Sequence, residues 1–182
     1  ANGHDAHFPV DVYQTGSGTS SNMNANEVIA RLANRQLGGG QAVHPNDHVN
    51  LGQSSNDVVP TTLRVAAVGA VAGQLLPALD HLHGVIAGRA QELDGVVKTG
   101  RTHLMDAMPL TFGQEFGAWA AQLDSARLRF DDTLVRLRRL PLGGTAVGTG
   151  VNADPRLAPA AVAVLAELTG QAFVPAPNLF EG

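Results

Sequence analysis

A long segment with apolar residues on every side limits what this chain can fold into. Residues 65–79 form a stretch of 15 without a charge, inside a predicted helix over residues 54–93 that Pro60 and Pro77 should disturb. A helix without a polar face needs cover on all sides. A chain of 182 residues rarely supplies so much cover, so we expect neighbouring subunits to provide it. The uncharged stretch is shorter than the roughly 20 residues that span a bilayer.

A second predicted helix covers residues 20–37, with Met23, Val28, Ile29 and Leu32 as its apolar residues. Residues 1–15 before it are expected to be loop. A triplet of glycines after it, residues 38–40, should end it.

Two more helices are predicted further along the chain. Residues 111–139 carry apolar side chains at alternating spacings of four and three, broken only by Thr133. This spacing is typical of the seam of a helix bundle. Residues 155–168 form the last helix, which Gly170 closes. We find no period-2 strand of convincing length, so the expected class is all-α, a bundle of long near-parallel helices. The seam consists of Phe112, Phe116, Trp119, Leu123, Ala126, Phe130 and Leu137.

Composition excludes several classes of function. The formal charge is −4 and charged residues make up 15% of the chain, without the basic patch of a nucleic-acid binder. The basic residues Arg136, Arg138 and Arg139 lie where a helix should end and complement its dipole. There are no cysteines, which excludes disulfides and thiolate chemistry and favours a cytoplasmic location.

Polar residues gather at two predicted helix starts. Residues 16–22 have the sequence Gly-Ser-Gly-Thr-Ser-Ser-Asn, and residues 53–57 have Gln-Ser-Ser-Asn-Asp, with Ser54 and Asp57 spaced as in a capping box. Free N–H groups and hydroxyls at a helix start suit an anion such as a carboxylate. Each segment alone is compatible with ordinary capping. Two together suit a dicarboxylate, with one helix start for each end.

Three other polar segments bear on function. The turn at residues 44–48 has two His and an Asp, but no further metal-ligand pattern accompanies it, so we expect no metal and no cofactor. His103 is followed by Leu104 and Met105, which suggests apolar surroundings; it is either a structural histidine or a general acid/base. The Gly-rich loop at residues 143–150 follows a helix and lacks the Lys-Ser/Thr of a phosphate loop, so a nucleotide site is not expected.

These segments, in this order, resemble class II fumarate hydratase of the fumarase/aspartase superfamily. Residues 16–27 and 99–114 are similar to the first two signatures of the superfamily, while the third, a Gly-Ser-Ser-x-Met-Pro-x-Lys-x-Asn run, is absent from the sequence. The resemblance implies an internal fragment of a longer enzyme. Residues 1–53 would end the N-terminal domain and carry the peripheral site, and residues 54–182 would begin the central helical domain, part of a tetrameric helical core.

The resemblance also implies a reaction and the residues that carry it. A lyase of this family adds water reversibly to fumarate to give (S)-malate, without a cofactor. Its partners would be a small dicarboxylate and the other subunits of a homotetramer with shared active sites, with neither nucleic acid nor membrane. The implied catalytic residue is His103, the implied substrate-binding residues are Ser17, Gly18, Thr19, Ser54, Ser55, Asn56 and Thr102, and a second dicarboxylate site would comprise His44, Pro45, Asn46 and Asp47.

Two alternatives stay open. Aspartate ammonia-lyase is a similar enzyme of the superfamily, but it usually has Gln where this chain has His103. A non-catalytic helical assembly piece is the other alternative. The second dicarboxylate site departs from the family pattern, because Gln41 stands where the family often has Arg, which weakens the expected anion affinity.

Overall fold

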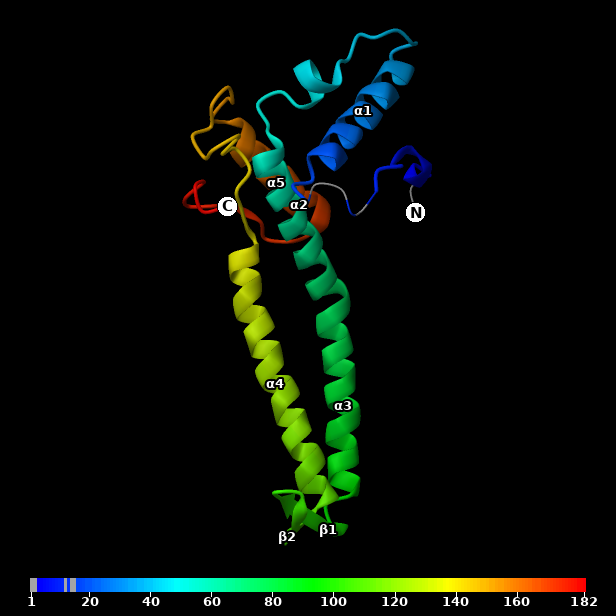
Figure 1. The fold of residues 1–182 in the computed structure, drawn as a ribbon, viewed down its shortest axis with the longest axis vertical. Helices are drawn as coiled ribbons and strands as arrows, with labels where there is room; N and C mark the ends of the chain where they lie inside the picture. The colour runs from blue at the N-terminus through cyan, green and yellow to red at the C-terminus, as the bar shows by residue number, and fades with distance from the viewer. Residues whose placement is uncertain (1–2, 12, 14–15) are drawn as a thin grey trace. The chain divides into compact units, whose positions relative to one another are not determined.

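The computed structural model describes residues 3–11, 13 and 16–182 and confirms the all-α class (Figure 1). The described chain forms two compact units, residues 1–66 with 137–182 and residues 67–136. The predicted domain division at residue 53 concerns the whole protein and stays a prediction. The main helices are α1 (Thr19–Gln36), α2 (Ser55–Ala70), α3 (Leu76–Glu92), α4 (Phe112–Leu137) and α5 (Leu157–Thr169), with a short 3-10 helix at Asp5–His7 and two-residue strands β3 (Arg139–Leu140) and β4 (Val174–Pro175).

The predicted long helix is confirmed, but only one of its two prolines disturbs it. Between α2 and α3 lies a π-helical turn at Val71–Leu75. It ends two residues before Pro77, whose ring clashes with the preceding turn when a proline lies in a helix interior. By contrast, α2 continues through Pro60. The carbonyl that loses its helical partner there belongs to Asn56, an exposed residue of the first turn, where the loss matters little.

The long helix is poorly covered within this chain. It is 38 residues long, and only 11% of its most apolar window is buried. By length and composition alone it could cross a membrane. The described residues of this chain therefore do not supply the expected cover on all sides.

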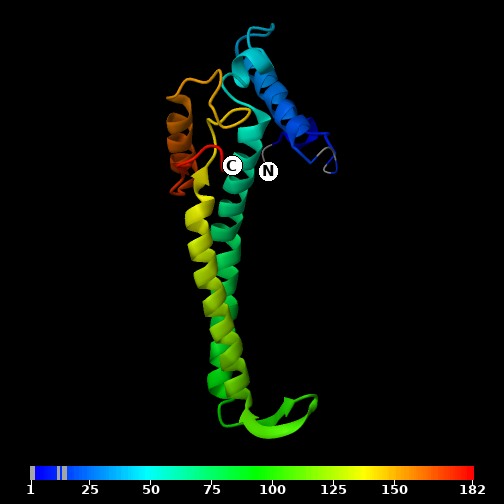
Figure 2. The ribbon, with the colours of Figure 1, turned by 60° about the vertical axis from the view of Figure 1, so that its left-hand side comes forward.

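Residues 67–136 form an antiparallel pair of long helices. Figures 1 and 2 both show α3 and α4 side by side. Two ion pairs join them: His83 Nε2 lies 3.3 Å from Asp124 Oδ1, and Arg127 Nη1 lies 2.7 Å from Asp80 Oδ1. Within α4, Gly113, Ala120 and Leu134 are buried, while most of the predicted seam is half-buried.

The absence of strands was a wrong prediction. At the end of this helix pair, β1 (Val97–Thr102) and β2 (Met105–Thr111) form an antiparallel hairpin with Thr102 opposite Met105. Most side chains of both strands are exposed, so there was no buried face to produce an alternation of apolar and polar residues. The two turn residues, His103 and Leu104, are also not the Asn-Gly type that indicates a hairpin.

The other unit has a small core around α5 and the Gly-rich loop. Leu140, Val162 and Phe173 are almost fully buried. The predicted last helix is confirmed, and Gly170 closes it with φ of +66°. This core supports the loop that follows α4 and leads to the start of α5.

Candidate functional site

The start of α1 turns sharply at a glycine. Gly18 precedes the helix with φ of +72°, a conformation that side chains rarely adopt. A Cβ on Gly18 would lie only 2.8 Å from the Val59 side chain of α2. Ser17 Oγ and Thr19 Oγ1 lie 3.2 Å apart and are exposed. The first helix start therefore packs against α2 while two hydroxyls face solvent.

The start of α2 has the predicted capping box. The Ser54 N–H donates to Asp57 Oδ1 at 3.0 Å, and Ser54 Oγ accepts from the Asn56 N–H at 3.2 Å. Ser55 is half-buried and Asn56 is exposed. Ser54 thus accepts from the N–H groups of both Asn56 and Asp57, through its hydroxyl and its carbonyl oxygen.

The structure brings the two helix starts together. Asn22 Nδ2 of α1 donates to Ser55 Oγ of α2 at 2.9 Å, and Gly18 contacts Val59. The hydroxyls and amides of the two starts thus belong to one local assembly. Their proximity was not evident from the sequence, since 33 residues separate Asn22 from Ser55.

Asp57 fixes the Gly-rich loop to the same place. Its side chain is buried, with 2% of its surface exposed. Oδ2 accepts from the N–H groups of Gly143 and Thr145, both at 2.9 Å. Between the α2 start and the loop lies a cavity of about 260 Å³, lined in part by Asn56, Thr145 and Gly148. The Gly-rich loop therefore lies beside the start of α2 and lines one side of this cavity.

The turn at residues 44–48 is held by its own histidines. His44 Nδ1 accepts from the N–H groups of Asn46 at 3.3 Å and Asp47 at 3.2 Å, and the His44 N–H donates to His48 Nδ1 at 2.8 Å. Asn46 and Asp47 are exposed. Because these N–H groups already have an acceptor, fewer of them are available to an anion.

Thr102 and His103 lie at the tip of the β1–β2 hairpin in the other unit. His103 and Leu104 have φ of +50° and +62°, as in a type I′ turn, which is strained for residues other than Gly, Asn and Asp. The expectation that apolar surroundings enclose His103 was wrong: the imidazole is exposed, and so are Leu104 and Met105. Strain held at an exposed tip is a common mark of a functional segment.

Lys98 anchors the base of this hairpin to α4. Lys98 Nζ donates to both carboxylate oxygens of Glu115 at 2.7 Å and lies 5.2 Å from the centre of the Phe112 ring. This ion pair is only about a fifth to a third exposed. The contacts fix the strand that leads to Thr102 and His103.

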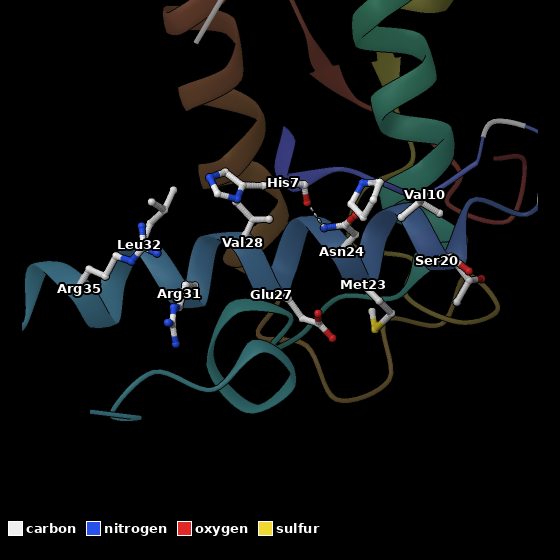
Figure 3. Close-up of a pocket in the computed structure, with 12 residues that line it drawn as sticks. His7, Val10, Ser20, Met23, Asn24, Glu27, Val28, Arg31, Leu32 and Arg35 are labelled. Atoms are coloured by element: carbon white, nitrogen blue, oxygen red, sulfur yellow. Dashed lines mark hydrogen bonds between the residues drawn. The ribbon is translucent and has the colours of Figure 1, made fainter. Parts of the chain in front are cut away.

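A groove lies along α1 and is lined by three of the apolar residues predicted for this helix. Its volume is about 810 Å³, and Met23, Val28 and Leu32 line it. Figure 3 shows these side chains with Asn24, whose Nδ2 donates to the His7 carbonyl at 2.9 Å. The residues that α1 buries are Asn22, Asn26, Ala30 and Asn34 instead. Their repeat of four residues was the signal that could have found them.

Comparisons with known proteins assign the family. A family model described as a lyase matches residues 1–182, so the chain belongs to this lyase family. Within it, the chain is 68% identical over 179 residues to a class II fumarate hydratase from Xylella fastidiosa, covering 98% of this chain and 37% of that protein. The resemblance inferred from the sequence motifs is therefore confirmed.

Two further matches agree. A class II fumarate hydratase from Pseudomonas aeruginosa is 56% identical over 174 residues, covering 96% of this chain and 38% of that protein. The crystal structure of a class II fumarase from Schistosoma mansoni matches with a TM-score of 0.85 at 38% identity, over 97% of this chain and 41% of that chain. The chain thus spans less than half the length of these relatives.

Proposed function

We propose that the whole protein is a fumarate hydratase that interconverts fumarate and (S)-malate by reversible addition of water. The observation that carries this proposal is the pairing of two helix starts rich in hydroxyls, joined by the Asn22–Ser55 hydrogen bond. The identity of 68% to a class II fumarate hydratase supports the same reaction.

The proposed chemistry needs donors that are in place before the reaction. When malate loses water, a weakly acidic proton leaves the carbon beside a carboxylate, and negative charge moves onto that carboxylate. Preorganised N–H and O–H donors stabilise such charge. One carboxylate region of the substrate would be bound by Ser17, Gly18 and Thr19. The other substrate-binding residues would lie beside it at the start of α2: Ser54, Ser55 and Asn56.

His103 would hold or protonate the departing hydroxide, and Thr102 would contact the substrate. Both lie on an exposed hairpin tip, which can reach a site on another subunit. Each active site would then combine segments of several chains in a cytoplasmic homotetramer. The long helix, with 11% of its apolar window buried, provides surface for such an assembly.

The peripheral turn would bind a second dicarboxylate only weakly. His44 occupies the backbone donors of Asn46 and Asp47, and Gln41 brings no charge. Pro45 would hold the shape of the turn, since it begins its helical part.

The loss or gain of fumarate absorbance in the ultraviolet tests the proposal directly. The whole protein should hydrate fumarate and dehydrate (S)-malate without an added cofactor. Release of ammonia from aspartate, without fumarate hydration, would instead indicate the ammonia-lyase reaction.

The 182-residue chain alone should be inactive in the same assay. By resemblance, the base that removes the carbon-bound proton belongs to the third signature, which this sequence lacks. Binding groups without that base can hold a dicarboxylate but cannot complete the reaction. Robust turnover by this chain alone would show that the base was placed wrongly.

A further inference from the structure

One face of α1 is buried and yet built from amides. Asn22, Asn26 and Asn34 are 8%, 6% and 9% exposed, and buried amides are unfavourable unless they are hydrogen-bonded. Asn34 bonds both the N–H and the carbonyl of Val43, each at 2.8 Å. This face therefore holds the segment between α1 and α2 by hydrogen bonds in place of apolar packing.

Asn50 links two of these amides. Its Oδ1 accepts from Asn26 Nδ2 at 3.1 Å and from Asn22 Nδ2 at 3.5 Å, while its Nδ2 points to the Gln53 carbonyl at 3.5 Å. Because Asn50 Oδ1 can only accept a hydrogen bond, Asn22 must turn its amide nitrogen, and not its amide oxygen, toward Asn50. The orientation of the Asn22 amide is therefore set by its neighbours.

The same nitrogen of Asn22 determines where the Ser55 hydroxyl points. Nδ2 donates to Ser55 Oγ at 2.9 Å, and an amide nitrogen accepts no hydrogen bond. The single hydrogen of Ser55 must then point away from α1. A hydroxyl held in this way is ready to donate to a carboxylate.

We propose that Asn22 is a positioning residue that orients the Ser55 hydroxyl as a donor to a substrate carboxylate. The inference rests on the proposed function, in which Ser55 binds the dicarboxylate. Asn22 lies one turn into α1, and its own N–H donates to the Gly18 carbonyl at 2.9 Å. It thus connects the two halves of the proposed substrate site.

A double-mutant cycle in the whole protein tests this role. Asn22→Leu keeps the buried volume similar but removes the donor, so the Ser55 hydroxyl can rotate. The KM for fumarate should rise about fivefold, the scale of one hydrogen bond, with kcat changed less. In a Ser55→Ala background, Asn22→Leu should change KM by less than about twofold, because it acts through Ser55.

Asn26→Leu is the matched control. Asn26 lies on the same face and is similarly buried, but its side-chain nitrogen donates to Asn50 and not to Ser55. The Asn26→Leu variant should lower the melting temperature as Asn22→Leu does. Its KM for fumarate should stay within about twofold of the wild-type value. If Asn22→Leu gives too little folded protein, Asn22→Ala takes its place in the cycle.

The outcomes separate the two hypotheses. An equal rise in KM in both backgrounds, or an equal rise from Asn26→Leu, would overturn the positioning role while leaving the proposed function intact. A wild-type protein that does not hydrate fumarate would overturn the proposed function and this inference with it.

Discussion

The turn at His103 allows a substitution that removes the imidazole and keeps the backbone. His103 has φ of +50°, and Asn is among the residues that tolerate this region best. His103→Asn should therefore fold normally. In the whole protein it should lower kcat by roughly 10²–10⁴-fold, the usual contribution of a general acid/base, and change KM much less because the carboxylates are bound elsewhere.

Steady-state kinetics and thermal melting together check this prediction. An unchanged melting temperature with a large loss of kcat would assign the effect to the imidazole. Turnover close to that of the wild type would make His103 a structural residue of the turn.

Contacts between residues a few positions apart could be predicted from the sequence, whereas contacts between residues far apart in the chain could not. The spacing of Ser54 and Asp57 predicted a capping box that the structure contains. The second oxygen of Asp57 binds Gly143, 86 residues away, and nothing in a local pattern encodes such a bond. Asn22 was missed for a different reason: a buried face made of amides is invisible to a search for apolar periodicity.

At the scale of elements, the β1–β2 hairpin depends on one glycine. Gly100 lies at the irregularity between Thr99 and Arg101. A Cβ there would lie 2.4 Å from the Met108 carbonyl oxygen, closer than any real contact. Gly100→Ala should distort the hairpin at a cost of about 1–3 kcal/mol and lower kcat in the whole protein at least tenfold, because Thr102 and His103 would shift.

Gly95→Ala is the control for this prediction. Gly95 precedes the same hairpin, and a Cβ on it would meet open space. The activity of the Gly95→Ala variant should match that of the wild type. Hydrogen exchange of the hairpin amides should become faster only in the Gly100→Ala variant. Equal activity in the two variants would mean that the hairpin geometry does not matter for turnover.

Elements with a buried face were predicted well, and the exposed hairpin was not. The bounds of α1, α4 and α5 differ from those predicted by only a few residues, because apolar periodicity and Gly or Pro stops mark them. The hairpin lacks both signals. Its shape comes from Gly100 and from the Lys98 contacts to Glu115 and Phe112, which join residues of different elements.

At the scale of the whole molecule, the long helix over residues 55–92 leaves a large apolar surface open. Its apolar window is 11% buried, and a soluble protein rarely leaves so large an apolar surface in water. A bilayer, the remainder of the protein or other copies of it can cover this surface. The charged and polar pairs along α3 and α4, such as Asp80 with Arg127 and His83 with Asp124, favour protein over lipid, because ion pairs are unfavourable in a hydrocarbon environment.

We therefore expect the whole protein to be a tetramer that stays in solution without detergent. Light scattering coupled to size-exclusion chromatography should give four times the mass of one chain, independent of concentration down to the lowest measurable value. Replacing Leu82, which is exposed on α3 within a single chain, by Asp should dissociate the assembly or abolish soluble expression, since a charge would enter an apolar contact. A stable monomer of the wild-type protein, or a requirement for detergent, would contradict a helical core shared between subunits.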